Sequence, residues 1–562
     1  MKLSLALFAE PALAYARRLF WVSTLLLWLP MTVYITWLNQ GYSLWLLQGV
    51  LVVVSMVGLV VINAETAVVI YGAWGGAWGL NHRPSRGLIQ HLGRRLGLFR
   101  SDSHPIAPPK KDSPKKDSLE KVSLEKVLLE KVPLEKVPLE EGSLAGVNSG
   151  LPCLAGGIQT LSMVRSTLEP KVARLPSALA EPFTSVVVVA YLPNEQDIIE
   201  DTLLHWLTQV TPPAAGWEII LAYNTPTPLP VESRLQALAR RYPALVLLPV
   251  AQSHSKAENL NMALPMVRGE MTGIFDADHH PAADCLGRAW PWLSQGRYDV
   301  VQGRNMIRNA EDSWLTQLIA VEFECIYGVS HYGRSLLADT ALFGGSNGYW
   351  RTAALRQVGF HSTRLTEDID ATVRGLVGGY RLVHDPAIVT TELAPDNLRG
   401  LWLQRQRWSQ GWLEVAGLHL GRVLRSPHLD AVQKPYWLLM LLFSQCFYPL
   451  VWQVVPMLLS IFVSDHDRDL DFETLNLVLM GLLTVSVVLQ VAVAMGLRPA
   501  GSTYTRRHGL MYCLLSPVYF WLKVLIGMVA VVNHLCGSRV WHVTARTKSK
   551  PKRWRAALRE VK

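Results

Sequence analysis

The stretch SVVVVAYLPNEQDIIEDTLLHWL, Ser185–Leu207, decides the fold of this chain. Its first seven residues form an apolar run typical of a buried strand, and an amphipathic helix follows from Asn194. Further apolar runs occur downstream at Trp217–Tyr223, Ala244–Val250 and Met271–Asp278. Strands that alternate with helices predict an α/β domain with a parallel sheet covered on both faces. Such sheets bind ligands at the carboxyl ends of their strands, where polar residues lie here.

The composition predicts membrane segments on both sides of this domain. Half of the 562 residues are hydrophobic and only 17% are charged, against about 25% in a typical soluble protein. We predict an amphipathic interfacial helix at 1–19 and two transmembrane helices within 20–71, about Phe20–Leu38 and Leu44–Ile62. About three transmembrane or re-entrant helices are expected at 437–536. The chain is therefore predicted to be an integral membrane protein of the plasma or inner membrane.

Charge predicts the orientation of the chain and its partners. The formal net charge is +10, and the positive residues cluster beside the apolar runs, as orientation in a bilayer requires. We therefore predict a lipid bilayer as a partner and no nucleic acid. The basic segment 72–108 places the α/β domain in the cytosol.

The C-terminal part conflicts with this rule. If all three late segments cross the membrane, the basic tail at 537–562 lies outside. A re-entrant segment or a hidden interfacial helix would remove the conflict, and the sequence leaves both open.

A linker separates the first spans from the α/β domain. Residues 109–182 contain a drifting five-residue repeat with units such as EKVPL. Its period spreads apolar residues around a helix axis, and its prolines break helices. We predict disorder here and no catalytic role.

Two acidic clusters follow predicted secondary-structure boundaries. Asp276 and Asp278 end the fourth strand, where two carboxylates can hold a divalent cation together with a diphosphate. Glu367 and Asp368 open a helix. That position also favours acidic residues through the helix dipole, but one carboxylate could instead remove a proton from an attacking hydroxyl.

Two further clusters carry positive charge. The run QRQRW, Gln404–Trp408, lies in a segment at 401–436 that we predict to form interfacial helices. Arginine offers a planar fork for phosphate oxygens, and tryptophan offers a flat face for a sugar ring. Snorkelling arginines with a tryptophan anchor are the alternative interpretation. In KAENLN, Lys256 could bind a nucleotide or its phosphates.

Together these clusters resemble the processive family-2 glycosyltransferases, the group of cellulose, hyaluronan and poly-N-acetylglucosamine synthases. The matching motifs run in family order between Phe183 and Trp412: KAENLN, FDADHHP, FGGSNGYWR, TEDID and QRQRW. The resemblance implies a GT-A fold over 183–400 and inverting transfer from a UDP-sugar, UDP-glucose or UDP-N-acetylglucosamine. It also implies Mg²⁺ or Mn²⁺ as the cofactor.

The same resemblance assigns roles residue by residue. It implies that Asp276 and Asp278 hold the metal and the diphosphate, and that Asp368 is the general base, supported by Glu367. Gln404 and Arg407 would lie near the pyrophosphate, and Trp408 near the acceptor. Gly345 and Ser346 match the loop that lines the acceptor.

The nucleotide end departs from the family pattern. Asn224 follows the second strand where an aspartate usually contacts the base. An asparagine still accepts a hydrogen bond but carries no charge. The usual P-x-Y-N-E run is only partly matched before Glu195. His279 and His280 follow the aspartate pair and are left out of the predicted metal set.

The leading hypothesis is a synthase that extends a β-linked polysaccharide and exports it. The alternative is a non-processive relative that glycosylates a lipid or a short glycan. An inactive membrane scaffold with the same fold is a lesser alternative. Accessory subunits are a further expected partner. A transporter is supported only by the spans, which hold almost no charged residues.

Overall fold

The computed structural model describes residues 21–42, 44–74, 180–463, 470–499, 502 and 504–538. The helix predicted at 1–19, the basic segment beyond Trp74, the linker up to residue 179 and the tail from residue 539 lie outside the described residues.

The four predicted strands are present and parallel. They are β1 (Thr184–Tyr191), β2 (Trp217–Asn224), β3 (Leu245–Pro249) and β4 (Met271–Asp276). They stand in the order β3-β2-β1-β4, with β1 paired to both β2 and β4. The ends of β1, β2 and β4 therefore meet at one edge of the sheet.

The other half of the sheet corrects the prediction of a purely parallel sheet. The strands β7 (Gly348–Arg351), β6 (Val300–Ile307), β8 (Leu382–Glu392) and β5 (His280–Pro281) complete an eight-stranded sheet. β7 runs antiparallel to both β4 and β6, and β5 runs antiparallel to β8. In the turn before β7, Gly345 and Asn347 take positive φ angles of 84° and 54°, a conformation that glycine and asparagine tolerate best. The sheet is therefore mixed, as in a GT-A domain.

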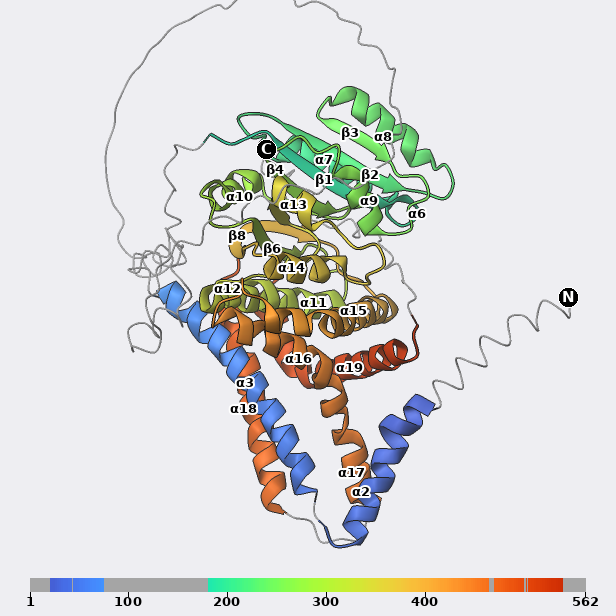
Figure 1. Ribbon diagram of the computed structural model, residues 1–562, viewed down its shortest axis with the longest axis vertical. Helices are drawn as coiled ribbons and strands as arrows, with labels where there is room; N and C mark the ends of the chain where they lie inside the picture. Colours follow the sequence, from blue (N-terminus) through green and yellow to red (C-terminus); the bar gives the residue numbers. More distant parts are fainter. Residues whose placement is uncertain are drawn as a thin grey trace, which may run out of the picture.

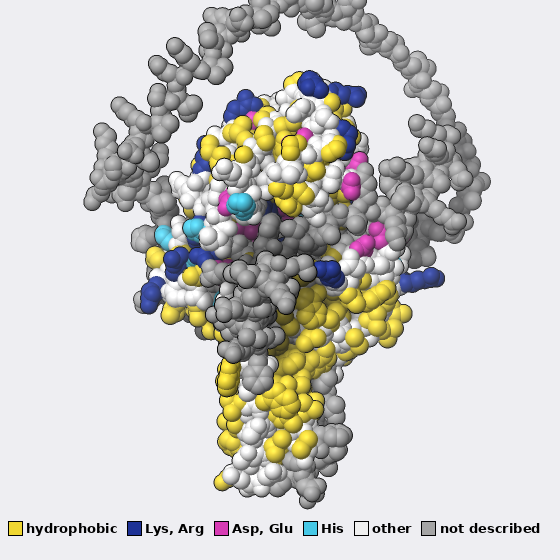
Figure 2. All heavy atoms as spheres, turned by 90° about the vertical axis from the view of Figure 1, so that its right-hand side faces the viewer, with side chains coloured by type: hydrophobic (Ala, Val, Ile, Leu, Met, Phe, Trp, Pro, Cys, Tyr) yellow, Lys and Arg dark blue, Asp and Glu magenta, His cyan; other side chains and the backbone are white. Residues whose placement is uncertain are grey.

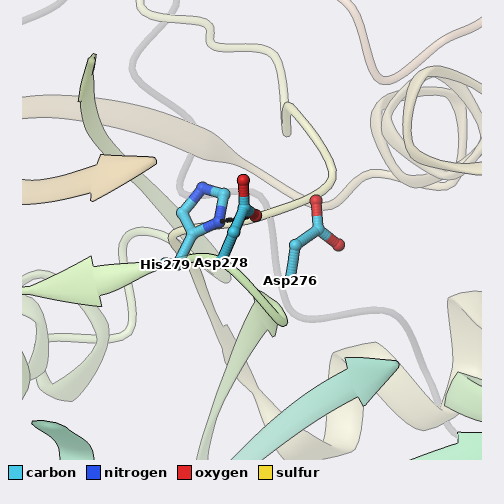
Figure 3. A group of neighbouring side chains, drawn as sticks. All are labelled: Asp276, Asp278 and His279. Atoms are coloured by element: carbon cyan, nitrogen blue, oxygen red, sulfur yellow. Dashed lines mark hydrogen bonds and ion pairs between the residues drawn. The ribbon is translucent and has the colours of Figure 1, made fainter. Parts of the chain in front are cut away.

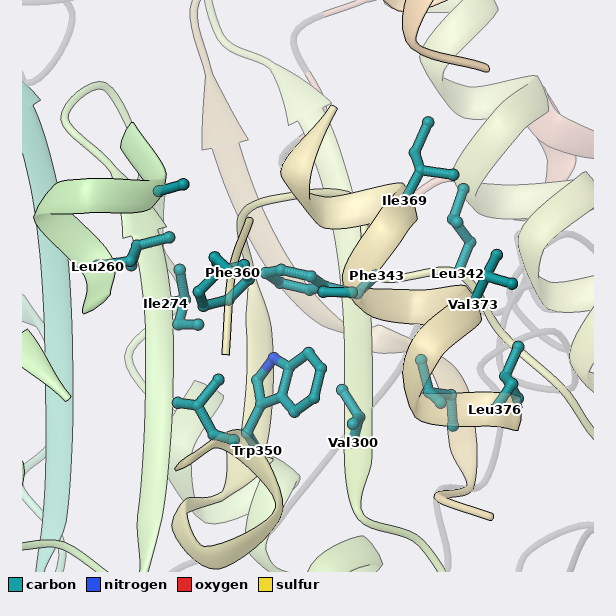
Figure 4. Close-up of a cluster of buried hydrophobic side chains, with 14 of the residues drawn as sticks. Leu260, Ile274, Val300, Leu342, Phe343, Trp350, Phe360, Ile369, Val373 and Leu376 are labelled. Carbon is teal, nitrogen blue, oxygen red and sulfur yellow. The ribbon is translucent and has the colours of Figure 1, made fainter. Parts of the chain in front are cut away.

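Helices cover both faces of the sheet. Val186 and Val188 of β1 pack in one core with α7 (Ile199–Gln209), α8 (Pro230–Arg241) and α10 (Cys285–Ser294). Val187 and Val189 pack in the other core with α9 (Lys256–Ala263), α13 (Thr352–Val358) and α14 (Glu367–Val377). Figure 4 shows Phe343, Trp350 and Phe360 in contact within the second core. The alternation of side chains along a strand places these residues on opposite faces.

Two predicted helices differ in their extent. The helix expected from Asn194 is split into α6 (Leu192–Glu195) and α7, with a turn between them. The segment predicted to hold interfacial helices at 401–436 contains the long helix α15 (Leu398–Arg425) and the first residues of α16 (Gln433–Trp452).

The membrane segments extend away from the α/β domain. α2 (Leu29–Asn39) follows η1 (Thr24–Trp28), and α3 (Trp45–Trp74) returns to the domain; α17 (Val454–Val463) and α18 (Leu470–Gly496) form a second such pair. In Figure 1 these helices point away from the sheet, and Figure 2 shows apolar side chains over this lower part. Within the described residues, four helices are long and apolar enough to cross a membrane: Trp21–Asn39, Leu46–Tyr71, Gln433–Ile461 and Arg506–Leu535.

α3 extends beyond Ile62 and contains a buried acid. The helix continues beyond Ile62 to Trp74 and so contains Glu65, which is only 3% exposed. The hydroxyl of Tyr436 on α16 donates to Glu65 at 2.5 Å. Arg334 of α12 (His331–Ala338) lies 4.0 Å from the same carboxylate. These contacts join α3 to the α/β domain.

A buried arginine of the α/β domain also contacts the end of α18. Arg304 of β6 pairs with Glu324 in η2 (Glu324–Ser330), and both side chains are at most 3% exposed. Arg304 also donates from Nη1 to the backbone oxygen of Leu497, directly after α18, at 3.1 Å.

The last helix, α19 (Arg506–Leu535), lies across the direction of the other apolar helices. It packs against α15 and against α11 (Trp314–Phe323) of the α/β domain, and Figure 1 shows it beneath α15. Gln410 of α15 donates to the backbone oxygen of Ser538, just beyond its end. Before its start, Tyr504 is buried in a cluster that includes Leu401 of α15. Both ends of α19 therefore contact the α/β domain.

Candidate active site

A cavity of about 620 Å³ opens where the ends of β1, β2 and β4 meet α9, α14 and α15. Of the predicted site residues, Asp278 alone is missing from its wall. The others all line it: Glu195, Asn224, Lys256, Asp276, Gly345, Ser346, Glu367, Asp368, Gln404, Arg407 and Trp408. The structure thus brings together residues that lie more than 200 positions apart in the chain.

Lys256 is the central cation of the cavity. Ser255 caps α9 by accepting from the Glu258 amide at 3.2 Å, which fixes Lys256 at the first helical position. Its Nζ lies 2.5 Å from Asp276 and donates to the Gly345 oxygen at 2.7 Å. Burial works against the ammonium ion, but the carboxylates of Asp276 and Glu367 outweigh it and raise the pKa of Lys256. The side chain therefore stays charged at the end of β4.

The aspartate pair forms a candidate metal site. The ligand atoms of Asp276, Asp278 and His279 lie within 4.8 Å of one another (Figure 3). The Asp276 side chain is 31% exposed to the cavity. Asp278 is buried, where it accepts from the Leu393 amide at 3.1 Å and contacts His279 Nδ1 at 3.2 Å. Two carboxylates at a strand end fit a hard divalent cation. His279, which is not in the predicted metal set, lies directly beside them.

A residue that was not predicted from the sequence holds the loop Gly344–Ser346. Gln302 of β6 is fully buried, donates from Nε2 to the Ser346 oxygen at 3.0 Å, and accepts from the Gly344 amide at 2.9 Å. Ser346 in turn accepts from the Asp276 amide at 3.1 Å. A glutamine within an otherwise buried strand was the available signal, because a buried amide needs hydrogen-bond partners.

Asp368 lies at the first turn of α14, beside Lys256 and Gly345. Its Oδ1 accepts from the Ile369 amide at 2.9 Å. Burial and the neighbouring carboxylate of Glu367 raise the pKa of Asp368 to about 7, although Lys256 and Arg407 act in the opposite direction. A carboxylate with a pKa near neutrality can accept a proton from a hydroxyl and release it again.

The QRQRW run lies on α15, and three of its residues, Gln404, Arg407 and Trp408, line the same cavity. Gln404 is 6% exposed, and its Oε1 has no hydrogen-bond partner among the described residues. Arg407 donates from Nη1 to the Leu365 oxygen at 3.2 Å, which holds its guanidinium next to α14. Trp408 is half-buried on the cavity wall, one helical turn after Gln404. The helix period thus presents all three to one space.

An asparagine holds the part of the cavity wall at the end of β2. Asn224 Nδ2 donates to the Ser253 oxygen at 2.9 Å, and its Oδ1 accepts from Asn259 at 2.8 Å. The carboxylate of Glu195 accepts from the Tyr191 amide at 2.7 Å. Both predicted binding residues therefore shape the cavity wall through bonds to the protein itself.

These bonds make a prediction for Asn224→Asp. The carboxylate would keep the bond from Asn259 but would face the Ser253 oxygen without a donor. An unsatisfied, partly buried acceptor costs about 1–3 kcal/mol. We expect the melting temperature to fall by about 2–4 °C for each kcal/mol lost. The exposed substitution Asp284→Asn serves as the control, and an unchanged or higher melting temperature for Asn224→Asp would contradict the argument.

Comparison with known families identifies the class of protein. The model described as glycosyl transferase family group 2 matches residues 273–529, and the one described as glycosyl transferase family 2 matches residues 185–359. Together they cover the α/β domain and run on into α19. The chain therefore contains a family 2 glycosyltransferase domain, and its fold is the GT-A fold with apolar helices attached.

Similar proteins make different products. A beta-monoglucosyldiacylglycerol synthase of Trichormus variabilis is 30% identical over 240 residues, which is 41% of this chain and 49% of that protein. Glucomannan 4-beta-mannosyltransferase 7 of Arabidopsis thaliana is 30% identical over 30% of this chain and 31% of its own length. The poly-beta-1,6-N-acetyl-D-glucosamine synthase of Staphylococcus aureus is 26% identical over 40% of this chain and 53% of its own length. These matches span a third to a half of each relative.

One similar solved structure was determined with a donor and a metal. It is a mannosyltransferase from Pyrobaculum calidifontis in complex with GDP-Man and Mn²⁺, 20% identical, with a TM-score of 0.45. It covers 64% of this chain and 88% of that chain.

Proposed function

We propose that this protein transfers a sugar from a UDP-sugar to the growing end of a β-linked polysaccharide, with inversion at the anomeric carbon. The observation that carries the proposal is the convergence of Asp368, Lys256 and Asp276 on one cavity with the QRQRW run. UDP-glucose and UDP-N-acetylglucosamine are the proposed donors, and Mg²⁺ or Mn²⁺ the proposed cofactor.

The residues divide the reaction between them. Asp276, with Asp278 behind it, would hold the divalent cation, which neutralises the diphosphate when bound. Arg407 and Gln404 face the same space and would bind the pyrophosphate. Asp368 takes the proton of the acceptor hydroxyl while the oxygen of that hydroxyl attacks the anomeric carbon. The bond from that carbon to the phosphate oxygen breaks, and UDP leaves with the electron pair.

The test is a screen of nucleotide sugars with the protein in membranes and with Mg²⁺ or Mn²⁺. We expect nucleotide release and labelled product with UDP-glucose or UDP-N-acetylglucosamine. Release that occurs with GDP-mannose alone would replace the proposed donor. If no donor gives nucleotide release, the hypothesis of an inactive membrane scaffold is favoured instead.

Product length separates polymer synthesis from single transfer. Trp408, Trp412 and Tyr327 all line the cavity, and aromatic rings are groups on which sugar rings can stack. This wall favours a polymer. A similar protein is a glucolipid synthase, so single transfer to a lipid is the second candidate. Labelled products longer than a few sugars support the first, and single-sugar lipid adducts alone support the second.

We further propose that α19 lies in the plane of the membrane surface and that the α/β domain is cytosolic. Exposed apolar residues form one stripe along α19, namely Leu510, Leu514, Val518, Trp521 and Leu525. The opposite side, with Tyr519 and Ile526, is buried against the protein. With one side packed on the protein and the other side apolar and exposed, the helix can lie on the bilayer interface. Crossings by α2, α3, α16 with α17, and α18 would then leave Arg506 and the basic tail on the cytosolic side.

Cysteine labelling tests this topology. In a background with the native cysteines replaced by serine, we compare Gln40→Cys, in the turn between α2 and α3, with Ser538→Cys and with Asp430→Cys in the α/β domain. A membrane-impermeant maleimide added to intact cells is expected to label Gln40→Cys alone. Ser538→Cys and Asp430→Cys should react only after the membrane is opened. Labelling of Ser538→Cys from outside would show that α19 crosses the bilayer.

A further inference from the structure

A buried carboxylate gathers donors from two helices beside the cavity. Glu322 of α11 is only 6% exposed. Arg405 of α15 donates to it from Nη2 at 2.6 Å. The Tyr519 hydroxyl of α19 donates at 2.8 Å, and Lys523 of α19 at 3.1 Å. Burial acts to raise the pKa of Glu322, but Arg405 and Lys523 outweigh it and lower that pKa to about 2.

The other side of Arg405 contacts aromatic rings. Its guanidinium lies 4.2 Å from the ring centroid of Trp408 and 5.7 Å from that of Phe323. At these distances the flat guanidinium packs on the ring, which favours one orientation of the indole. Arg405 does not line the cavity, whereas Trp408 and Phe323 do. Arg405 thus contacts these two cavity-lining rings without reaching the cavity itself.

An ion pair that served stability alone would not require the arginine to pack on a residue of the cavity wall. The pair of Arg268 and Glu218 has the same chemistry, with 2.7 Å between the charged atoms and the arginine 5.3 Å from the Phe183 ring. It lies away from the cavity, and none of its three residues lines the wall. Arg405 differs because its aromatic partner is the tryptophan at the acceptor end, and because its carboxylate is shared with α19.

We propose that Arg405, fixed by Glu322, is a positioning residue that sets the orientation of Trp408 for the acceptor sugar. Tyr519 and Lys523 extend this connection to α19, so the acceptor end of the site is set from a membrane-associated helix. This inference rests on the proposed function, in which Trp408 lies next to the acceptor. It predicts an effect on acceptor binding and none on the donor.

The test is a kinetic comparison of Arg405→Lys and Tyr519→Phe with the wild-type protein in membranes. The acceptor probe is cellotetraose, chitotetraose or dioleoylglycerol, whichever the wild type glycosylates. Arg405→Lys keeps the charge but loses the flat guanidinium, so we expect its acceptor KM to rise about tenfold. Donor KM and the rate of donor hydrolysis without acceptor should stay within about twofold of wild type. Tyr519→Phe leaves Arg405 intact and should raise the same KM to a smaller extent.

Arg268→Lys is the control for the loss of an arginine that has a carboxylate and a ring as partners but no contact with the cavity; the Arg268 side chain is 68% exposed, against 8% for Arg405. Its acceptor KM should equal that of the wild type. An unchanged acceptor KM in both Arg405→Lys and Tyr519→Phe would overturn the inference, as would donor and acceptor KM rising together. If Arg405→Lys does not fold, Tyr519→Phe alone decides. A wild type that releases no nucleotide from any donor contradicts the proposed function instead.

Discussion

Asp368→Asn is expected to lower sugar transfer by about 10²–10⁴-fold, the range for removal of a general base. The asparagine keeps the size of the side chain and can still accept from the Ile369 amide, so the geometry of α14 is retained. It cannot take the proton of the acceptor hydroxyl. The measurement is initial-rate transfer with saturating donor, and donor KM should change little because Asp368 is not placed at the nucleotide.

The same substitution should make the protein more stable. The pKa of Asp368 is about 7 in the folded protein, against an ordinary value of 3.8. The folded state thus binds this proton more tightly than the unfolded state does. Protonation of Asp368 therefore adds fully to the free energy of unfolding below about pH 4, and this contribution is lost as the pH rises through 7. Asparagine carries no charge at any pH. At pH 8 we expect a higher melting temperature for Asp368→Asn, by about 2–4 °C for each kcal/mol regained.

The pH dependence of the wild type follows from the same group. Because the unprotonated carboxylate is the base, kcat/KM should rise with pH through a midpoint near 7. Asp284→Asn, at an exposed carboxylate beside α10, is the control and should change neither rate nor stability. A full rate for Asp368→Asn would exclude the proposed role.

Gly345→Ala is the second change with a large expected effect. A Cβ at this position would lie 2.8 Å from Asp368 Oδ2 and 3.3 Å from Lys256 Nζ. Both side chains would have to move, and a displacement of about 1 Å at reacting groups can lower a rate about 10²-fold. We expect a loss of transfer of at least that size, measured alongside the melting temperature.

Backbone strain has to be separated from this contact. Gly345 has a φ of 84°, which alanine adopts only with strain. Gly537, just after α19, has a φ of 71°, but a Cβ added there would have no described atom within 4 Å. Gly537→Ala therefore carries the strain without the contact. Equal losses of activity in the two variants would show that strain, and not the reacting groups, is responsible.

The parallel half of the sheet was predictable because its strands are buried on both faces. Val186 to Val189 read as one continuous apolar run, which is the pattern that such burial produces. The reversed strand β7 was not predictable, since its direction is defined by pairing with β4 and β6, which lie far from it in the chain. The turn before it contains Gly345 and Asn347, both with positive φ angles. These two residues were visible in the sequence only as part of an acceptor-loop motif.

The site was predictable where a motif carries its own chemistry. Lys256, Asp276 and Asp368 were found in this way, and they meet at one cavity. Gln302 and Glu322 were missed because each acts through partners far along the chain: Gln302 binds a loop 42 residues away, and Glu322 binds Arg405, 83 residues away. Spacing within one helix or strand does not show such contacts.

The contacts that join the domain to α3, α16 and α18 affect how the protein can be handled. If the sheet and its helices were expressed without the apolar segments, Arg334 would lose Glu65 and Tyr436. Arg304 would likewise lose its acceptor at Leu497. Hydrogen bonds to charged groups contribute about 1.5–3 kcal/mol each, and the apolar residues that pack against Val69 of α3 and Val491 of α18 would be exposed to water. We therefore expect the α/β domain to be less stable when it is expressed alone, which favours biochemical work on the intact chain in detergent or a lipid nanodisc.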